Sequence, residues 1–141
     1  NIVLSSYVPE IIGAEIRVLL GRALQNGGLD LADIEAWAVH PGGRAIVDRL
    51  ADLFALPADA LAPTYATLRD YGNMSSPTIL FVLRRLRAHL RETGVTALGA
   101  PGVAMAFGPG LVVEMARLRY VPAPDPAATG VPALALDAAQ S

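Results

Sequence analysis

Two polar residues, His40 and Asn73, stand at positions where a side chain could take part in chemistry. His40 ends an apolar run at residues 34–39, which predicts a buried strand that fixes its backbone. The segment Pro41-Gly42-Gly43 follows, and glycine lets another backbone or a substrate come close because it has no Cβ. A helix predicted after Gly43 would offer its partly positive N-terminus to an anion. A lone histidine is also commonly structural, so His40 is a candidate and no more.

Asn73 lies in a polar segment, Gly72-Asn73-Met74-Ser75-Ser76. An Asn in such a loop commonly bonds its own backbone, which requires no ligand. Alternatively, its amide N–H donates to an oxygen that gains negative charge during a reaction. One preorganised donor of this kind stabilises a transition state by about 2.7–4 kcal/mol. The sequence leaves both interpretations open.

Other kinds of site have little support. The chain has no Cys, which excludes disulfides, thiol chemistry and Cys-zinc sites within it. Its two histidines, His40 and His89, make a poor set of metal ligands, so we expect no metal. The segment Gly108-Pro109-Gly110 matches a hairpin turn and no nucleotide-binding loop. The serine pairs at 5–6 and 75–76 are not in a nucleophile elbow, so hydrolase chemistry is not indicated.

Helical and strand patterns alternate along the chain and predict the elements that position these residues. One helix should begin at Pro9 and end at Asn26-Gly27-Gly28, and another should follow Gly43 and end at Leu56-Pro57. This alternation predicts a layered α/β domain, with His40 at the sheet edge where ligands bind. The start of the chain, residues 1–7, is compatible with a strand, and a short helix interrupted near Pro63 is expected at 59–71. A further helix should open at Pro77, with Ser75 or Ser76 as its cap and with a buried stripe of Ile79, Leu83, Leu86 and Leu90. Strands at 103–107 and 111–120 should form a hairpin.

Length and composition bound the class of protein. The chain has 141 residues, and 53% of them are hydrophobic, which suffices to bury a core. Its net charge of −2 gives no general attraction to nucleic acid. No apolar run could span a bilayer and no signal peptide opens the chain, so we expect a cytoplasmic protein without a membrane partner. We place one domain at residues 1–120 and a Pro- and Ala-rich tail at 121–141.

The basic residues are all Arg and none is Lys, which together with the high Ala content is typical of a GC-rich bacterial genome. Four of them cluster at positions 84, 85, 87 and 91. They form either a solvated helix face or a patch that meets an anionic carrier or a partner.

Three segments together resemble the type III polyketide synthases, the chalcone and stilbene synthase-like family. Trp37-Ala38-Val39-His40-Pro41-Gly42-Gly43 resembles the signature around the family's catalytic histidine. Tyr71-Gly72-Asn73-Met74-Ser75-Ser76 resembles the signature around its catalytic asparagine, and Phe107-Gly108-Pro109-Gly110-Leu111 resembles a turn that lines its cavity. The segments have the family's order and spacing, and the resemblance covers residues 8–119. It therefore indicates the family's C-terminal domain.

The resemblance implies a fold and an activity. The fold is α/β, the C-terminal half of a thiolase-like fold, layered α/β/α with a mixed sheet. The activity is an acyltransferase reaction, the decarboxylative Claisen condensation of an acyl-CoA starter with malonyl-CoA on a Cys-His-Asn triad. It needs no cofactor beyond these coenzyme A thioesters, and the full enzyme is expected to be a homodimer.

The resemblance also assigns roles to single residues. His40 and Asn73 match the catalytic His and Asn. Ser75 and the turn at Gly108, Pro109 and Gly110 match positions that shape the substrate cavity. Gly42 and Gly43 match the loop near coenzyme A.

Three departures from the family pattern bear on activity. The nucleophilic Cys belongs to the family's N-terminal half, so we expect this chain alone to be inactive without that half as a partner. Ala106 stands where the family usually has Gly, and Val112 stands where it usually has Thr, which affects the expected size of substrate more than the chemistry.

Two alternatives remain at this stage. One is a free-standing, non-catalytic half that pairs with or regulates another subunit. The other is a ketoacyl-ACP synthase III-like enzyme, which shares the fold and the triad. Half of a two-half fold normally buries a face against its partner, so we also expect an exposed apolar patch or self-association.

Overall fold

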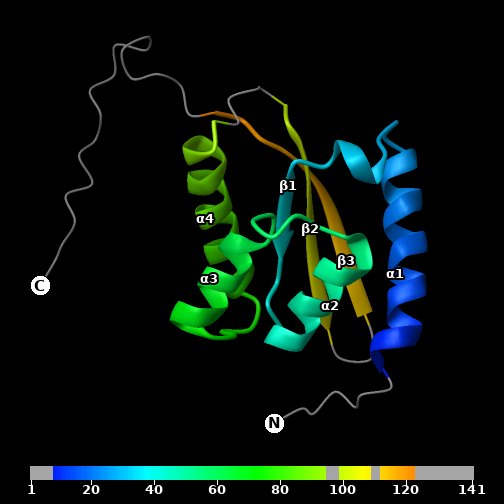
Figure 1. Cartoon of the computed structure of the whole chain (residues 1–141), viewed down its shortest axis with the longest axis horizontal. Helices are drawn as coiled ribbons and strands as arrows, with labels where there is room; N and C mark the ends of the chain where they lie inside the picture. Colours follow the sequence, from blue (N-terminus) through cyan, green and yellow to red (C-terminus); the bar gives the residue numbers. More distant parts are fainter. Residues whose placement is uncertain (1–7, 95–98, 109–111, 123–141) are drawn as a thin grey trace, which may run out of the picture.

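Helices and strands alternate along the chain, as the hydrophobic patterns predict. The computed structural model describes residues 8–94, 99–108 and 112–122. The predicted start strand at 1–7, Pro109, Gly110 and most of the tail lie outside these residues. The elements are α1 (Val8–Gln25), a short 3-10 helix η1 (Leu31–Asp33), β1 (Ala36–Val39), α2 (Arg44–Phe54), α3 (Ala62–Tyr71), α4 (Thr78–Glu92), β2 (Pro101–Gly108) and β3 (Val112–Arg119) (Figure 1).

The described strands form one mixed sheet in the order β1-β2-β3. β1 runs parallel to β2, with Val39 opposite Met105, and β2 runs antiparallel to β3. The parallel pair brings the carboxyl end of β1, which leads into His40, beside the carboxyl end of β2. The expected mixed α/β architecture is confirmed.

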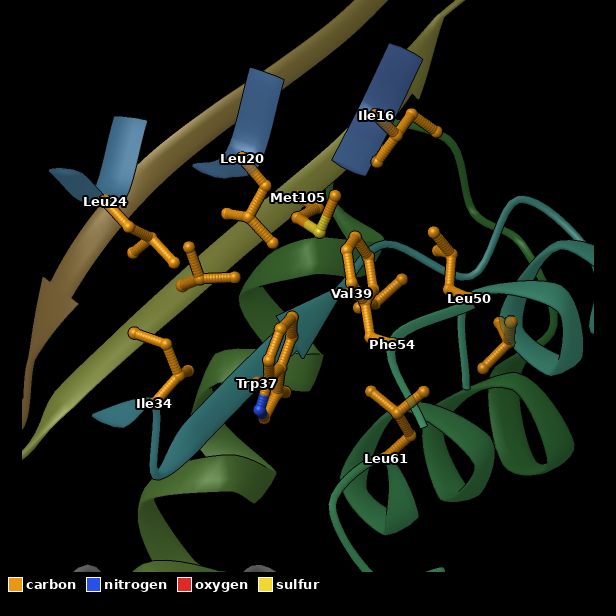
Figure 2. Packing of buried hydrophobic residues seen from close by; sticks show 12 residues of the cluster. Ile16, Leu20, Leu24, Ile34, Trp37, Val39, Leu50, Phe54, Leu61 and Met105 are labelled. Carbon is orange, nitrogen blue, oxygen red and sulfur yellow. The ribbon is translucent and has the colours of Figure 1, made fainter. Parts of the chain in front are cut away.

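One face of the sheet carries the larger of two apolar clusters. Trp37 and Val39 from β1 and Val103 and Met105 from β2 point to this face, because alternate strand residues share a side. They pack against α1 and α2, and the Trp37 and Phe54 rings lie 5.6 Å apart (Figure 2). The helix residues of the cluster are Ile16, Leu20 and Leu24 on α1 and Val47, Leu50 and Phe54 on α2.

The opposite face is lined by small residues. Ala36 and Ala38 of β1 pack against Val82, Leu86 and Leu90 of α4. Because alanine side chains are short, α4 can lie close to this face. Helices therefore cover both sides of the sheet, with α4 and α1 on opposite sides in Figure 1, and the layers are α/β/α.

Three details differ from the sequence expectations. The segment at 59–61 is a turn and α3 begins at Ala62, so Pro63 opens this helix where it was expected to interrupt one. No side chain caps α4, so the expected cap by Ser75 or Ser76 is wrong, and Pro77 is the cap residue. In the stripe of α4, Leu86 and Leu90 are buried as expected, but Thr78 and Val82 complete it while Ile79 and Leu83 are half-buried.

Gly102 sets how closely the two parallel strands approach. A Cβ on this residue would lie 2.8 Å from the Ala36 Cβ and 2.9 Å from the Ala36 carbonyl oxygen. Both neighbours belong to the strand pair itself, so neither can move without moving the backbone. A side chain at this position therefore forces β1 and β2 apart.

Replacing Gly102 by Ala should lower the free energy of unfolding by about 1–3 kcal/mol, the usual effect of overpacking. Gly21→Ala is the matched control, because a Cβ there meets nothing within 4 Å and Ala is favoured in a helix by about 0.5–1 kcal/mol. Urea unfolding of both variants measures the difference. Equal stability of the two variants would contradict the close approach of the strands.

Candidate active site

His40 is fixed at the end of β1 by its own backbone and by its neighbours. Its N–H donates to the Met105 carbonyl at 2.8 Å, which continues the β1–β2 ladder by one residue. Alternation along the strand places its side chain on the face that Ala36 and Ala38 share, toward α4. The residue is buried, with 8% of its surface exposed, and Pro41 after it is fully buried. The imidazole therefore has a defined position at the sheet edge.

The last carbonyl of β1 is held by a residue that the sequence interpretation did not single out. The Thr64 hydroxyl donates to the Val39 carbonyl at 3.1 Å, and Thr64 is completely buried on α3. A buried threonine on a helix was compatible with simple packing, so its type alone did not reveal this bond. It ties α3 to the strand end that carries His40.

The two glycines after His40 have different surroundings. The Gly42 N–H donates to the His40 carbonyl at 3.0 Å, and a Cβ on Gly42 would lie 3.3 Å from the Ile46 side chain. A Cβ on Gly43 would meet nothing within 4 Å. Gly42 thus fits a tight turn, whereas the space beside Gly43 is open.

Asn73 reaches this turn from the loop between α3 and α4. Its Nδ2 donates to the Gly42 carbonyl at 3.2 Å, and its Oδ1 accepts from the Ser75 N–H at 2.9 Å. The bond to Ser75 is the local turn that the structural interpretation expected. The bond to Gly42 links Asn73 to the His40 segment, 31 residues earlier in the chain. The local turn is therefore confirmed, and the role of the amide as a donor to a reacting oxygen stays a prediction.

Burial lowers the pKa of His40 from its ordinary value of 6.5. A side-chain hydrogen bond with Asn73 raises the pKa and so opposes this shift in part. The net effect favours the neutral imidazole, which keeps one N–H donor and one acceptor nitrogen. The Asn73 side chain thus affects the protonation of His40.

Two of the remaining predicted site residues, Ser75 and Gly108, lie within the described part of the chain. Ser75 is exposed and has a left-handed backbone, with φ of 66°. Gly108 is exposed at the carboxyl end of β2, at the sheet edge that also carries His40. The cavity roles of Ser75 and Gly108 and the coenzyme A role of Gly42 and Gly43 stay predictions. Those for Pro109 and Gly110 concern residues outside the described ones.

Ion pairs brace the two helices that flank the Asn73 loop. Arg85 of α4 lies 2.7 Å from the Asp70 carboxylate of α3, and its guanidinium lies over the Tyr71 ring at 5.2 Å. Hydrogen bonds from Arg69 and then Arg85 lower the pKa of Asp70 to about 2. Asp70 therefore stays charged at neutral pH and keeps α3 and α4 paired next to the loop.

A second set of side-chain contacts joins α2 to α3. The Tyr65 hydroxyl donates to Asp48 at 2.7 Å, and the Arg44 guanidinium lies 5.7 Å from the centre of the Tyr65 ring. Burial and the bond to Asp48 raise the pKa of Tyr65 to about 12, so the phenol keeps its proton. The helix that follows the glycine turn is thereby tied to the helix that holds the strand end.

The described residues also bear on other kinds of site. They contain no group of three or more His, Cys, Asp or Glu side chains that could hold a metal ion. A cavity of about 180 Å³ lies between α1 and Phe54, on the far side of the sheet from His40. Within this part of the chain, no helix is long and apolar enough to cross a bilayer.

Comparison with known proteins decides the family. The family described as chalcone and stilbene synthases, C-terminal domain, matches residues 1–122. The chain belongs to this family. The fold of the described residues is accordingly that of the C-terminal part of a type III polyketide synthase, which is thiolase-like.

Individual relatives agree with this family. The chain is 38% identical over 117 residues to a 3,5-dihydroxyphenylacetyl-CoA synthase of Amycolatopsis balhimycina and 35% identical to one of Streptomyces toyocaensis. It is similar to the crystal structure of PKS-I from the brown alga Ectocarpus siliculosus, with a TM-score of 0.72 and 32% identity over 84% of this chain. Neither a non-catalytic half nor a ketoacyl-ACP synthase is favoured by these matches.

This chain spans only part of its relatives. The match covers 83% of this chain but 30% of the Amycolatopsis balhimycina protein and 32% of the algal structure. What these relatives do as whole proteins therefore depends also on segments that this sequence does not contain.

Replacing Asn73 by Ala should lower the pKa of His40 further, because the substitution removes the hydrogen bond that raises it and leaves burial unchanged. NMR titration of the histidine ring signals measures this, with His89 on α4 as the internal control. His40 binds a proton more readily in the unfolded chain than in the folded one. The free energy of unfolding should therefore have its full value above about pH 6.5 and decrease as the pH falls below it, with a larger decrease in the variant. An unchanged or raised pKa in the variant would contradict the contact.

Proposed function

We propose that this chain supplies the His and Asn of a Cys-His-Asn triad in a type III polyketide synthase. The enzyme condenses an acyl-CoA starter with malonyl-CoA by decarboxylative Claisen condensation. The observation that carries this proposal is the buried His40 at a strand end with the Asn73 amide bonded to Gly42 beside it. This arrangement supports the assignment of the two side chains, which come from distant segments, as N–H donors at one sheet edge.

The decarboxylation step uses these donors on the malonyl thioester. The bond to the carboxylate breaks, carbon dioxide leaves, and the electron pair moves into an enolate whose negative charge lies on the thioester oxygen. His40 donates to this oxygen from its neutral imidazole. Asn73 has two amide N–H groups and Gly42 takes only one of them, so the amide retains a second donor. Such donors act most strongly where charge develops.

The condensation step needs a nucleophile that this chain does not contain. The enolate carbon attacks an acyl-thioester held on a Cys, the new carbon–carbon bond forms, and the thiolate leaves. We assign this Cys to the N-terminal half of the enzyme, in line with the partial coverage of the relatives. A thiolate next to His40 would raise the pKa of the imidazole by opposite charge and favour an ion pair. The chain alone would then be inactive.

The substrates and cofactor requirement of the enzyme follow from this chemistry. The substrates are acyl-CoA and malonyl-CoA, and no further cofactor is required. The matched relatives are named for an aromatic CoA thioester, which supports chemistry on such thioesters. The open space beside Gly43 is consistent with a coenzyme A arm near the Gly42 and Gly43 turn. We place the full enzyme in the cytoplasm as a homodimer.

The domain division is part of the same proposal. Residues 1–120 would form the catalytic C-terminal domain, and residues 121–141 would form a tail outside it. The family match over residues 1–122 supports this boundary. Exposed apolar side chains on α1, Val18 at 53% and Leu19 at 48%, are compatible with a face that the other half covers, and this covered face stays a prediction.

In the whole enzyme, His40→Ala and Asn73→Ala should each reduce malonyl-CoA decarboxylation by about 10²–10³-fold, the usual effect of losing one such donor. Release of carbon dioxide from labelled malonyl-CoA measures this step. His89→Ala on α4 is the matched control and should retain wild-type activity. Retained decarboxylation in His40→Ala would refute the role of His40.

A further inference from the structure

Ser75 has a backbone conformation that its residue type does not favour. Its φ is 66°, and few residues other than glycine adopt a positive φ. Within the described residues, the other non-glycine case is Ala55, which ends α2. A left-handed residue is common at a helix end, so Ala55 has an ordinary explanation. Ser75 lies in the loop before α4 and has no such explanation.

The backbone of Ser75 is bonded on both sides. Its N–H donates to the Asn73 Oδ1 at 2.9 Å. Its carbonyl accepts from the Thr78 hydroxyl at 2.7 Å and from the Thr78 N–H at 3.0 Å. The φ and ψ of a residue set the direction of its N–H relative to its carbonyl. The left-handed conformation is therefore what allows both sets of bonds at once.

The Thr78 side of this arrangement is buried, whereas the Asn73 side is exposed. Thr78 is completely buried at the start of α4, and its hydroxyl also accepts from the Met74 N–H at 2.8 Å. Asn73 is exposed, and its amide is held by Ser75 and Gly42. If Ser75 could not remain left-handed, the bonds to Thr78 would persist and the bond to Asn73 would be lost.

We propose that Ser75 is a positioning residue for Asn73. Its left-handed backbone directs the Ser75 N–H to the side-chain oxygen Oδ1 of Asn73, and this turns the amide N–H groups toward Gly42 and the His40 segment. The inference rests on the proposed function and gives Ser75 a role that depends on backbone conformation, whereas a cavity-lining role depends on side-chain size.

Two substitutions of similar size separate these roles in the whole enzyme. Asn is among the non-glycine residues that best tolerate a positive φ, whereas the β-branched Thr disfavours it. Ser75→Asn and Ser75→Gly should lower the turnover number for malonyl-CoA decarboxylation less than Ser75→Thr does. Ser75→Thr should lower it by about tenfold or more with little change in KM, since the lost donor acts in the transition state.

A second readout does not depend on activity. In Ser75→Thr, the pKa of His40 measured by NMR should fall toward its value in Asn73→Ala, because Asn73 no longer bonds the imidazole. Ser75→Asn should keep the wild-type value. Ser75→Ala is a milder change, so its turnover number and its His40 pKa should lie between those of Ser75→Asn and Ser75→Thr. It replaces Ser75→Thr in the comparison if that variant does not fold.

The outcomes distinguish this inference from the function on which it rests. Wild-type turnover and His40 pKa in the Thr and Ala variants, with loss in Asn73→Ala, would overturn the positioning role and leave the proposed function intact. Losses of turnover that follow side-chain size, and that are therefore equal in Ser75→Asn and Ser75→Thr, would also overturn the positioning role. Full activity of Asn73→Ala would instead refute the function, and the pKa series would still test the bond between Ser75 and Asn73.

Discussion

The backbone bond from the His40 N–H to the Met105 carbonyl joins the end of β1 to β2, and the candidate site depends on this fixed strand end. The Thr64 hydroxyl holds the carbonyl of the preceding residue, Val39, from the side of α3. Close approach of the two strands at Gly102 and Ala36 keeps the pair in register. His40 can therefore remain buried with a defined orientation at an edge that would otherwise fray. Its lowered pKa is a direct result of that burial.

The second half of the site is built on a different principle. Asn73 is exposed and belongs to a loop, so packing does not fix it. Hydrogen bonds do so instead, to Gly42 on one side and to Ser75 on the other. The loop gains its shape from Thr78 at the buried start of α4 and from the Arg85–Asp70 pair that joins α3 to α4. A histidine held by its strand and an asparagine held by hydrogen bonds thus meet at one edge of the sheet.

Much of this could be predicted from the sequence because apolar periodicity and helix-ending residues carry a local signal. The run before His40 and the Gly27-Gly28 stop are such cases, and α1, α2 and β1 follow from them. The signature segments also identified the family. The functions of Thr64 and Thr78 could not be predicted, because a hydroxyl that bonds a distant or neighbouring carbonyl looks in sequence like any other threonine. The start of α3 was predicted wrongly because proline can either interrupt a helix or open one, and the local sequence does not decide between them.

The central claim is that His40 and Asn73 together bind the thioester oxygen of malonyl-CoA. A crystal structure of the whole enzyme with a malonyl-CoA analogue that cannot lose carbon dioxide tests it most directly. We expect the thioester oxygen within about 2.7–3.2 Å of both an imidazole nitrogen of His40 and the Nδ2 of Asn73. A thioester oxygen that contacts neither nitrogen would contradict the claim.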